Sequence, residues 1–119
     1  MECEQKYRIN TKEEILIFGS NKKLELNIFN NIYEFKGEIC TDTVNIMKNI
    51  LDSKKTNGYS EIIFDFSGVN YVDSCGLGGL LKYAQRFRKM GYDFKIINVK
   101  DKVKEVIEIT KLSGLLGVQ

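Results

Sequence analysis

Residues 61–81 read EIIFDFSGVNYVDSCGLGGLL and combine a short apolar run, a polar loop and an apolar segment with helical spacing. Residues 62–66 are almost continuously apolar, which is typical of a central strand covered on both faces. The segment after the loop predicts a helix over residues 75–90, and Gly91 suits the left-handed position that follows a helix. The apolar stripe of this helix consists of Leu77, Leu80, Leu81, Ala84 and Phe87. The stretch therefore predicts a buried strand that leads through a loop into a helix.

The segments before this stretch change from a period of two to a period near four. Apolar residues alternate over residues 24–28 and 32–35, with Asn30 and Asn31 between the two runs, which predicts a β-hairpin. Spacings of three and four residues follow over residues 41–57 and predict a helix that Thr41 is suited to cap.

The C-terminal part continues the alternation of strand and helix. Residues 94–99 predict a strand, residues 101–112 a helix and residues 115–118 a terminal strand. Together these elements predict an α/β fold, with a mixed sheet of four to five strands and helices packed against one main core.

With 119 residues, 43% of them hydrophobic, the chain is long and apolar enough for one domain with its own core. We divide it into an N-terminal extension, residues 1–23, and a domain over residues 24–119. The extension holds one apolar run, residues 15–18, followed by the turn-forming residues 19–21, which predicts an extra strand or a short hairpin. Three roles stay open for it: a strand added to the sheet edge, a contact with a partner, or a contact between copies.

Composition excludes several classes of function. Because the chain has no histidine, histidine-based general bases, catalytic triads and zinc sites are excluded. The 18 Lys and Arg residues nearly balance the 16 Asp and Glu residues, which argues against nucleic-acid binding through bulk charge. We therefore expect a protein partner, no cofactor and no enzymatic activity.

Cysteine usage and hydropathy predict a cytoplasmic protein. Cys3, Cys40 and Cys75 are widely spaced and odd in number, which fits free thiols in a reducing compartment. No apolar run approaches the roughly 20 residues of a membrane span, and the start MECEQKYRIN lacks the apolar stretch of a signal peptide.

Small and polar residues cluster where the loop meets the predicted helix, in the segment DSCGLG at residues 73–78. A helix N-terminus offers unpaired backbone N–H groups and the positive end of the helix dipole, so a phosphate on Ser74 would be stabilised there. The alternative is structural: Asp73 or Ser74 caps the helix, while Gly76 and Gly78 let it pack closely on the sheet. Capping and phosphorylation can coexist at adjacent residues.

Nucleotide binding and thiol chemistry fit this segment less well. Gly76 lies ten residues after Phe66, whereas the glycines of a dinucleotide site follow their strand directly. The P-loop order GxxxxGK[ST] is missing. Cys75 has no histidine or second cysteine nearby, so we interpret it as a small buried residue rather than a nucleophile.

The predicted helix also carries a basic face. Lys82, Arg86 and Lys89 follow at i, i+4 and i+7. Arg88 lies nearby, and residues 77–90 include no acidic residue. Two interpretations are open: a solvated face, or a patch that steers an acidic partner surface toward the loop.

Residues 65–81, DFSGVNYVDSCGLGGLL, resemble the signature of anti-sigma factor antagonists, in which a strand leads through a D-S-S/x-G-L-G motif into a helix. The segment KGEICTDTVNIMKNIL at residues 36–51 is similar to the family's strand end and first helix, and NVKDKVKEVIEITKLSGLL at residues 98–116 to its closing helix. The resemblance covers residues 24–118 and implies a STAS-like fold. Two features depart from the family: Cys75 stands where a second serine is common, and residues 1–23 extend beyond the usual start.

The resemblance also implies a function. Ser74 would be phosphorylated by a cognate anti-sigma factor serine kinase and dephosphorylated by a serine phosphatase, and the unmodified protein would bind the kinase and free a sigma factor. The residues implied in partner binding are Asp73, Ser74, Cys75, Gly76, Leu77, Gly78, Lys82 and Arg86. The alternative keeps the fold but makes the chain a STAS-like scaffold or a transporter-associated interaction domain.

Overall fold

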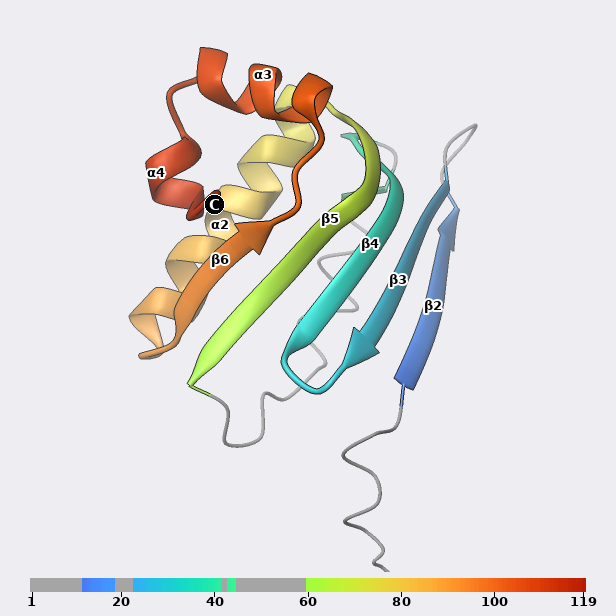
Figure 1. Cartoon of the computed structure of the whole chain (residues 1–119), viewed down its shortest axis with the longest axis vertical. Helices are drawn as coiled ribbons and strands as arrows, with labels where there is room; N and C mark the ends of the chain where they lie inside the picture. Colours follow the sequence, from blue (N-terminus) through green and yellow to red (C-terminus); the bar gives the residue numbers. More distant parts are fainter. Residues whose placement is uncertain (1–11, 19–22, 42, 45–59) are drawn as a thin grey trace, which may run out of the picture.

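The computed structural model describes residues 12–18, 23–41, 43–44 and 60–119. These parts of the chain form a five-stranded sheet with helices packed on it (Figure 1). The strands are β2 (Lys12–Phe18), β3 (Lys23–Phe29), β4 (Ile32–Ile39), β5 (Glu61–Val72) and β6 (Asp93–Ile97), and the helices are α2 (Ser74–Lys89), α3 (Asp101–Ile109) and α4 (Ser113–Leu116). The strand order is β2-β3-β4-β5-β6; the first two pairings are antiparallel and the last two parallel. The predicted α/β class with a mixed sheet is confirmed.

β2 is the extra strand that the apolar run in the N-terminal extension predicted. It pairs antiparallel with β3, from Lys12 opposite Phe29 to Phe18 opposite Lys23. The division of the chain at residue 23 stays a prediction.

The hairpin β3–β4 forms as the alternation predicted. Asn30 has a positive φ of 57°, which asparagine tolerates better than most residues, and it lets a two-residue turn connect the strands. Leu24 and Leu26 of β3 and Phe35 of β4 are fully buried on the side of the sheet that faces the core.

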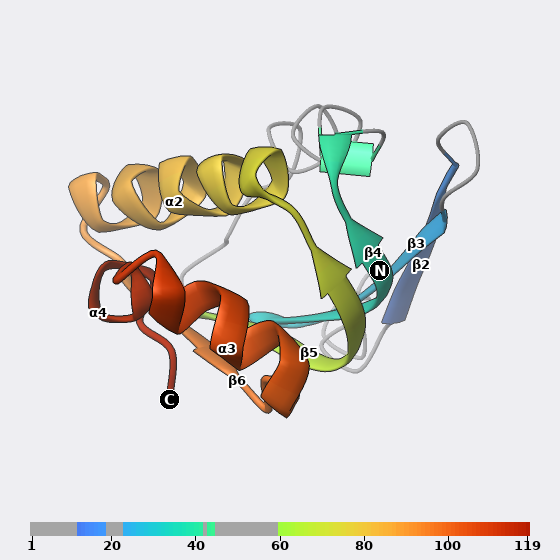
Figure 2. The same cartoon turned by 90° about the horizontal axis from the view of Figure 1, so that it is seen from above.

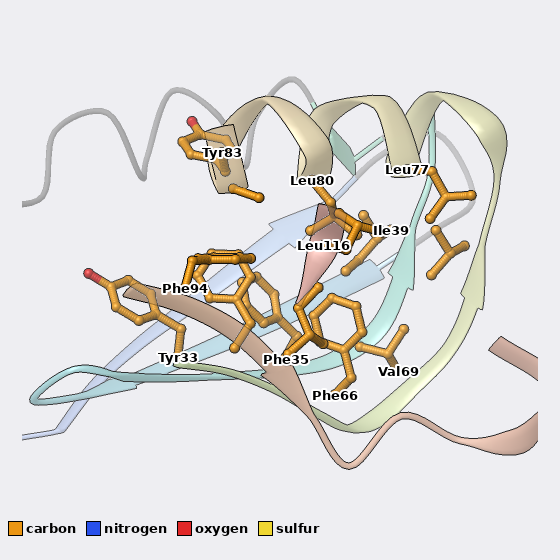
Figure 3. Packing of buried hydrophobic residues seen from close by; sticks show 14 of the residues in the cluster. Tyr33, Phe35, Ile39, Phe66, Val69, Leu77, Leu80, Tyr83, Phe94 and Leu116 are labelled. Atoms are coloured by element: carbon orange, nitrogen blue, oxygen red, sulfur yellow. The ribbon is translucent and has the colours of Figure 1, made fainter. Parts of the chain in front are cut away.

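β5 is buried on one face, so the prediction of a strand covered on both faces was wrong. Ile62, Phe64 and Phe66 are buried, whereas Ile63 and Asp65 between them are half-exposed. The buried side chains pack into one core with α2 and α4 (Figure 3). Within that core the Phe64 ring lies 4.8 Å from the Phe35 ring and 4.8 Å from the Phe94 ring, measured between centroids.

Two register shifts against β4 bend β5 along its length. Glu34 is opposite Asp65 but Lys36 is opposite Gly68, and a second shift follows between Gly37 and Glu38. Such bulges kink a strand and increase its twist. A Cβ at Gly68 would lie 2.4 Å from Cγ of Lys36 and 3.1 Å from its Cα, so Lys36 would have to shift to make room for a larger residue. As a result, β5 rises from the sheet toward the start of α2 (Figure 2).

α2 packs on the sheet with a face slightly different from the predicted stripe. Leu77, Leu80, Ala84 and Phe87 are buried as expected, and Gly76, Gly79 and Tyr83 are buried with them. Leu81 is only partly buried, which corrects its place in the stripe. Leu81 still packs against the core from its margin. The helix ends as predicted, with Gly91 at a φ of 95° after the cap residue Met90.

The C-terminal segment differs from its prediction. α3 ends at Ile109, before the predicted residue 112. Residues 113–116 form the short helix α4 in place of the predicted terminal strand, and Val118 makes a single bridge to Ile96. Gly117, with a φ of 69°, ends α4 in the left-handed conformation. Leu116 is completely buried in this helical turn.

Candidate functional site

The candidate site lies where two neighbouring parallel strands end. Ile39 at the end of β4 is opposite Val72 at the end of β5, and the backbone N–H of Asp73 donates to the carbonyl of Ile39 at 3.3 Å. The chain enters α2 at Ser74 directly after this contact. Residues from two parts of the chain therefore meet at one edge of the sheet.

Asp73 is the N-cap of α2, which decides between the two capping residues that the sequence left open. Its backbone is extended, and its Oδ1 accepts the N–H of Gly76 at 2.8 Å. Its carbonyl accepts the N–H of Leu77 at 2.9 Å, the first bond of the helix. Ser74 is left as the first helical residue, with its hydroxyl not needed for the cap.

Thr41 completes the surroundings of the Asp73 carboxylate, and sequence reasoning missed this role. Oδ2 of Asp73 accepts the backbone N–H of Thr41 at 3.1 Å and its hydroxyl at 3.2 Å. Thr41 was expected to cap its own helix, but it is itself helical, and the carbonyl of Cys40 accepts the first bond, from Val44 at 2.8 Å. Most of the helix predicted over residues 41–57 lies outside the described residues.

Asp73 is the residue whose charge the site stabilises. Partial burial alone would raise its pKa, but hydrogen bonds from Gly76, from the backbone and hydroxyl of Thr41, and from Cys75 outweigh that effect. The pKa of the carboxyl therefore lies below its ordinary value. A second negative group placed beside it would meet a carboxylate that is already ionised.

Ser74 and Cys75 are both exposed in the first turn of α2. The exposure of Cys75 corrects the expectation that it is buried, because the helix points it away from the sheet. Cys40 is buried, and both cysteines are free thiols as predicted, while Cys3 lies outside the described residues. Ser74 therefore faces solvent at the start of α2.

The glycines of the motif divide into two groups. A Cβ at Gly76 would lie 2.1 Å from the carbonyl oxygen of Ile39, and one at Gly79 would lie 2.4 Å from Cγ2 of Val44, so packing explains both. A Cβ at Gly78 would meet nothing within 4 Å. Gly78 is exposed one turn after Ser74, and neither residue has a long side chain.

The basic residues expected to contact a partner continue this surface along α2. Lys82 and Arg86 are exposed on the turns after Gly78. Arg88 points elsewhere: it donates to the carbonyl of Leu115 and, at 3.2 Å, to that of Phe94. Gly76 and Leu77 are buried, so these two members of the predicted binding set support the surface from below.

A groove of about 360 Å³ borders the site on the side of α3. Tyr71 and Val72 of β5 form one wall, and Val103 and Val106 of α3 form the other. Val72 lies two residues before Ser74, so the groove and the start of α2 share one edge of the molecule.

Among the residues that the structure describes, no three Asp, Glu, Cys or His side chains are grouped as metal ligands would be. Within those residues, no helix is long and apolar enough to cross a bilayer.

Comparisons with known proteins agree with this architecture. The model of the STAS domain family matches residues 22–119. The anti-sigma-B factor antagonist of Staphylococcus aureus strain NCTC 8325 is 28% identical over 100 residues, which cover 82% of this chain and 93% of that protein. Among solved structures, the anti-sigma factor antagonist SpoIIAA in its unphosphorylated form has a TM-score of 0.62 at 17% identity, covering 83% of this chain and 86% of that one. A sulfate transporter family protein from Wolinella succinogenes has a TM-score of 0.64 at 20% identity, covering 74% of each chain.

Proposed function

Because the chain belongs to the STAS domain family, we propose that it is an anti-sigma factor antagonist that phosphorylation of Ser74 switches off. The unmodified protein binds an anti-sigma factor kinase in the cytoplasm and so frees a sigma factor. The activity is binding rather than catalysis. A serine phosphatase removes the phosphate and so restores the form that binds the kinase.

One observation carries the proposal: Ser74 is exposed at the first position of α2, directly beside the ionised carboxylate of Asp73. The cap is made by Asp73, so the Ser74 hydroxyl is available for modification without loss of the helix. The similarity to curated anti-sigma factor antagonists supports the same role.

The binding surface comprises the exposed start of α2 and its basic continuation. Ser74, Cys75 and Gly78 let a partner approach the helix closely, and Lys82 and Arg86 attract acidic groups of that partner. Asp73 holds the surface in shape through its cap, with Gly76 and Leu77 beneath it.

Phosphate opposes this contact in two ways. It adds about −1.5 to −2 charges at neutral pH in the middle of the surface, beside Asp73. A partner surface that fits the small Ser74 hydroxyl must then either bury the phosphate charge or lose its contact with this part of α2. A loss of about 3 kcal/mol of binding free energy raises the dissociation constant more than a hundredfold, which is enough for a switch.

The alternative role, a scaffold or transporter-associated domain, has weaker support. The Wolinella transporter family protein is 20% identical, and a likeness at that level supports the fold alone. The curated anti-sigma-B factor antagonist is matched over nearly its whole length, which favours the sigma-factor role.

A capture experiment tests the proposal. The immobilised wild-type protein is incubated with a lysate of its source organism, and the retained proteins are identified by mass spectrometry. The retained kinase is then incubated with the free protein and ATP, and the phosphate is mapped. We expect one phosphate on Ser74. Phosphate on Ser67 or Ser113, or no retained kinase, contradicts the proposal.

A further inference from the structure

Thr41 and Asp73 connect two parts of the chain that are 32 residues apart, and Ser74 follows the connected carboxylate directly. Oδ2 of Asp73 accepts two hydrogen bonds from Thr41, at 3.1 and 3.2 Å. Oδ1 accepts the N–H of Gly76 at 2.8 Å. The segment after β4 therefore holds one oxygen of the carboxylate, and the first turn of α2 holds the other.

Burial does not account for the hydroxyl bond of Thr41. Thr41 is exposed, so water is available to its hydroxyl, and the bond to Asp73 is not needed to satisfy a buried group. Thr43, two residues later, is the opposite case: it is completely buried, and its hydroxyl donates to the carbonyl of Glu38 at 2.7 Å. Burial therefore explains the hydroxyl bond of Thr43, whereas the hydroxyl bond of Thr41 holds the carboxylate of Asp73.

Holding both oxygens limits the motion of the cap. The carboxyl torsion of an aspartate is broad when one oxygen is bound, because rotation about an sp³–sp² bond has no deep minima. Each of the two hydrogen bonds from Thr41, one from the backbone N–H and one from the hydroxyl, narrows that range and helps to keep Oδ1 on Gly76. The backbone between Asp73 and Gly76, which includes Ser74, is fixed as a consequence.

We propose that Thr41 is a positioning residue for the phosphorylation of Ser74, a role that rests on the function proposed above. In that step the Ser74 oxygen bonds to the terminal phosphorus of ATP, the bond from this phosphorus to ADP breaks, and the hydroxyl proton passes to a base of the kinase. Phosphoryl transfer depends chiefly on the positions of the reacting groups. Thr41 supplies part of this positioning by holding the Asp73 cap, and so the Ser74 backbone, in one arrangement.

Three variants test the role of Thr41. Thr41→Val removes the hydroxyl but keeps the backbone N–H and the side-chain volume, and Thr41→Ser restores the hydroxyl. Thr110→Val is the matched control, because the Thr110 hydroxyl also makes a local hydrogen bond, to the carbonyl of Ile107 at 2.6 Å, at the end of α3. All three are phosphorylated with ATP by the kinase retained on the wild-type protein.

We expect Thr41→Val to lower kcat about fivefold, the size of one net hydrogen bond, with KM nearly unchanged because Gly78, Lys82 and Arg86 are intact. Thr41→Ser should recover most of the rate, and Thr110→Val should match the wild type. Hydrogen exchange gives a readout without the kinase: the Gly76 amide should exchange faster in Thr41→Val than in the other proteins.

The outcomes separate this role from the proposed function. No phosphate on wild-type Ser74 contradicts the function itself and the role of Thr41 with it. Normal phosphorylation of Ser74 in Thr41→Val, failure of Thr41→Ser to recover the rate, or an equal loss in Thr110→Val contradicts the role of Thr41 alone.

Discussion

Gly78 differs from the other glycines in the first half of α2. Packing against the sheet and against Val44 requires Gly76 and Gly79, but nothing in the described structure contacts the position of a Cβ at Gly78. A glycine inside a helix costs about 0.5–1 kcal/mol relative to alanine. The fold does not account for that cost, whereas close approach of the proposed partner next to Ser74 would account for it.

The variant Gly78→Ala should therefore separate stability from binding. We expect it to raise the free energy of unfolding by about 0.5–1 kcal/mol in urea denaturation, because alanine is the better helix former. The same variant should bind the captured kinase more weakly, because the methyl group stands in the contact surface. Gly114→Ala in α4 is the control, since a Cβ there also meets nothing. Unchanged kinase binding by Gly78→Ala would remove Gly78 from the surface.

The ionisation of Asp73 makes the free energy of unfolding depend on pH, and the hydrogen bonds to its carboxylate set the direction of this dependence. Its pKa is lowered in the folded protein, so its contribution is fully present above the unfolded value of about 4 and is lost as pH falls through the folded pKa. Asp73→Asn keeps a capping oxygen but has no charge to titrate. We expect the stability difference between wild type and Asp73→Asn to shrink between pH 6 and pH 3 in urea denaturation. A difference that grows on acidification would show that the hydrogen bonds do not favour the charged form.

Among the structural elements, α2 determines how the site is oriented, because one face of this helix packs on the sheet. Leu80 is completely buried, while Leu81 is only partly buried. Leu80→Ala should therefore lower the free energy of unfolding by about 2–5 kcal/mol, as expected for a buried leucine whose cavity does not collapse. Leu81→Ala, the matched control on the same turn, should cost less than half as much. Equal losses in thermal or urea unfolding would place the core face of α2 elsewhere.

The elements that the sequence predicted well are those with a local signal. The β3–β4 hairpin follows from alternation around Asn30 and Asn31, and the end of α2 follows from Gly91. In the site, a helix cap by Asp73 or Ser74 also follows from residues near each other in sequence, and the structure assigns it to Asp73.

The elements that were predicted wrongly depend on distant contacts. The apolar residues of α4 are too few for periodicity to distinguish a helix from a strand. The bond between Thr41 and Asp73 forms because β4 and β5 are parallel neighbours, and no local pattern records that pairing. Only one face of β5 is covered, and this likewise depends on where the helices pack.

At the scale of the whole molecule, the fold brings the residues of the proposed switch together at one edge of the sheet. Parallel pairing of β4 and β5 places their carboxyl ends together, and the bulges in β5 raise its end toward α2 (Figure 2). The formal net charge is +2, so one phosphate of about −1.5 to −2 charges nearly cancels it. A phosphate on Ser74 would concentrate this change at the start of α2, next to Asp73, and would therefore act on the proposed contact surface rather than on the core.

The affinity of the captured kinase for this protein before and after phosphorylation tests the switch most directly. The wild-type protein and Ser74→Ala are each treated with the kinase and ATP, repurified, checked by intact mass, and titrated against fresh kinase in a calorimeter. The account predicts that wild type gains one phosphate and binds more than about a hundredfold more weakly, the effect of about 3 kcal/mol. Ser74→Ala should stay unmodified and keep its affinity. Equal affinities of the phosphorylated and unmodified wild-type protein would contradict the switch.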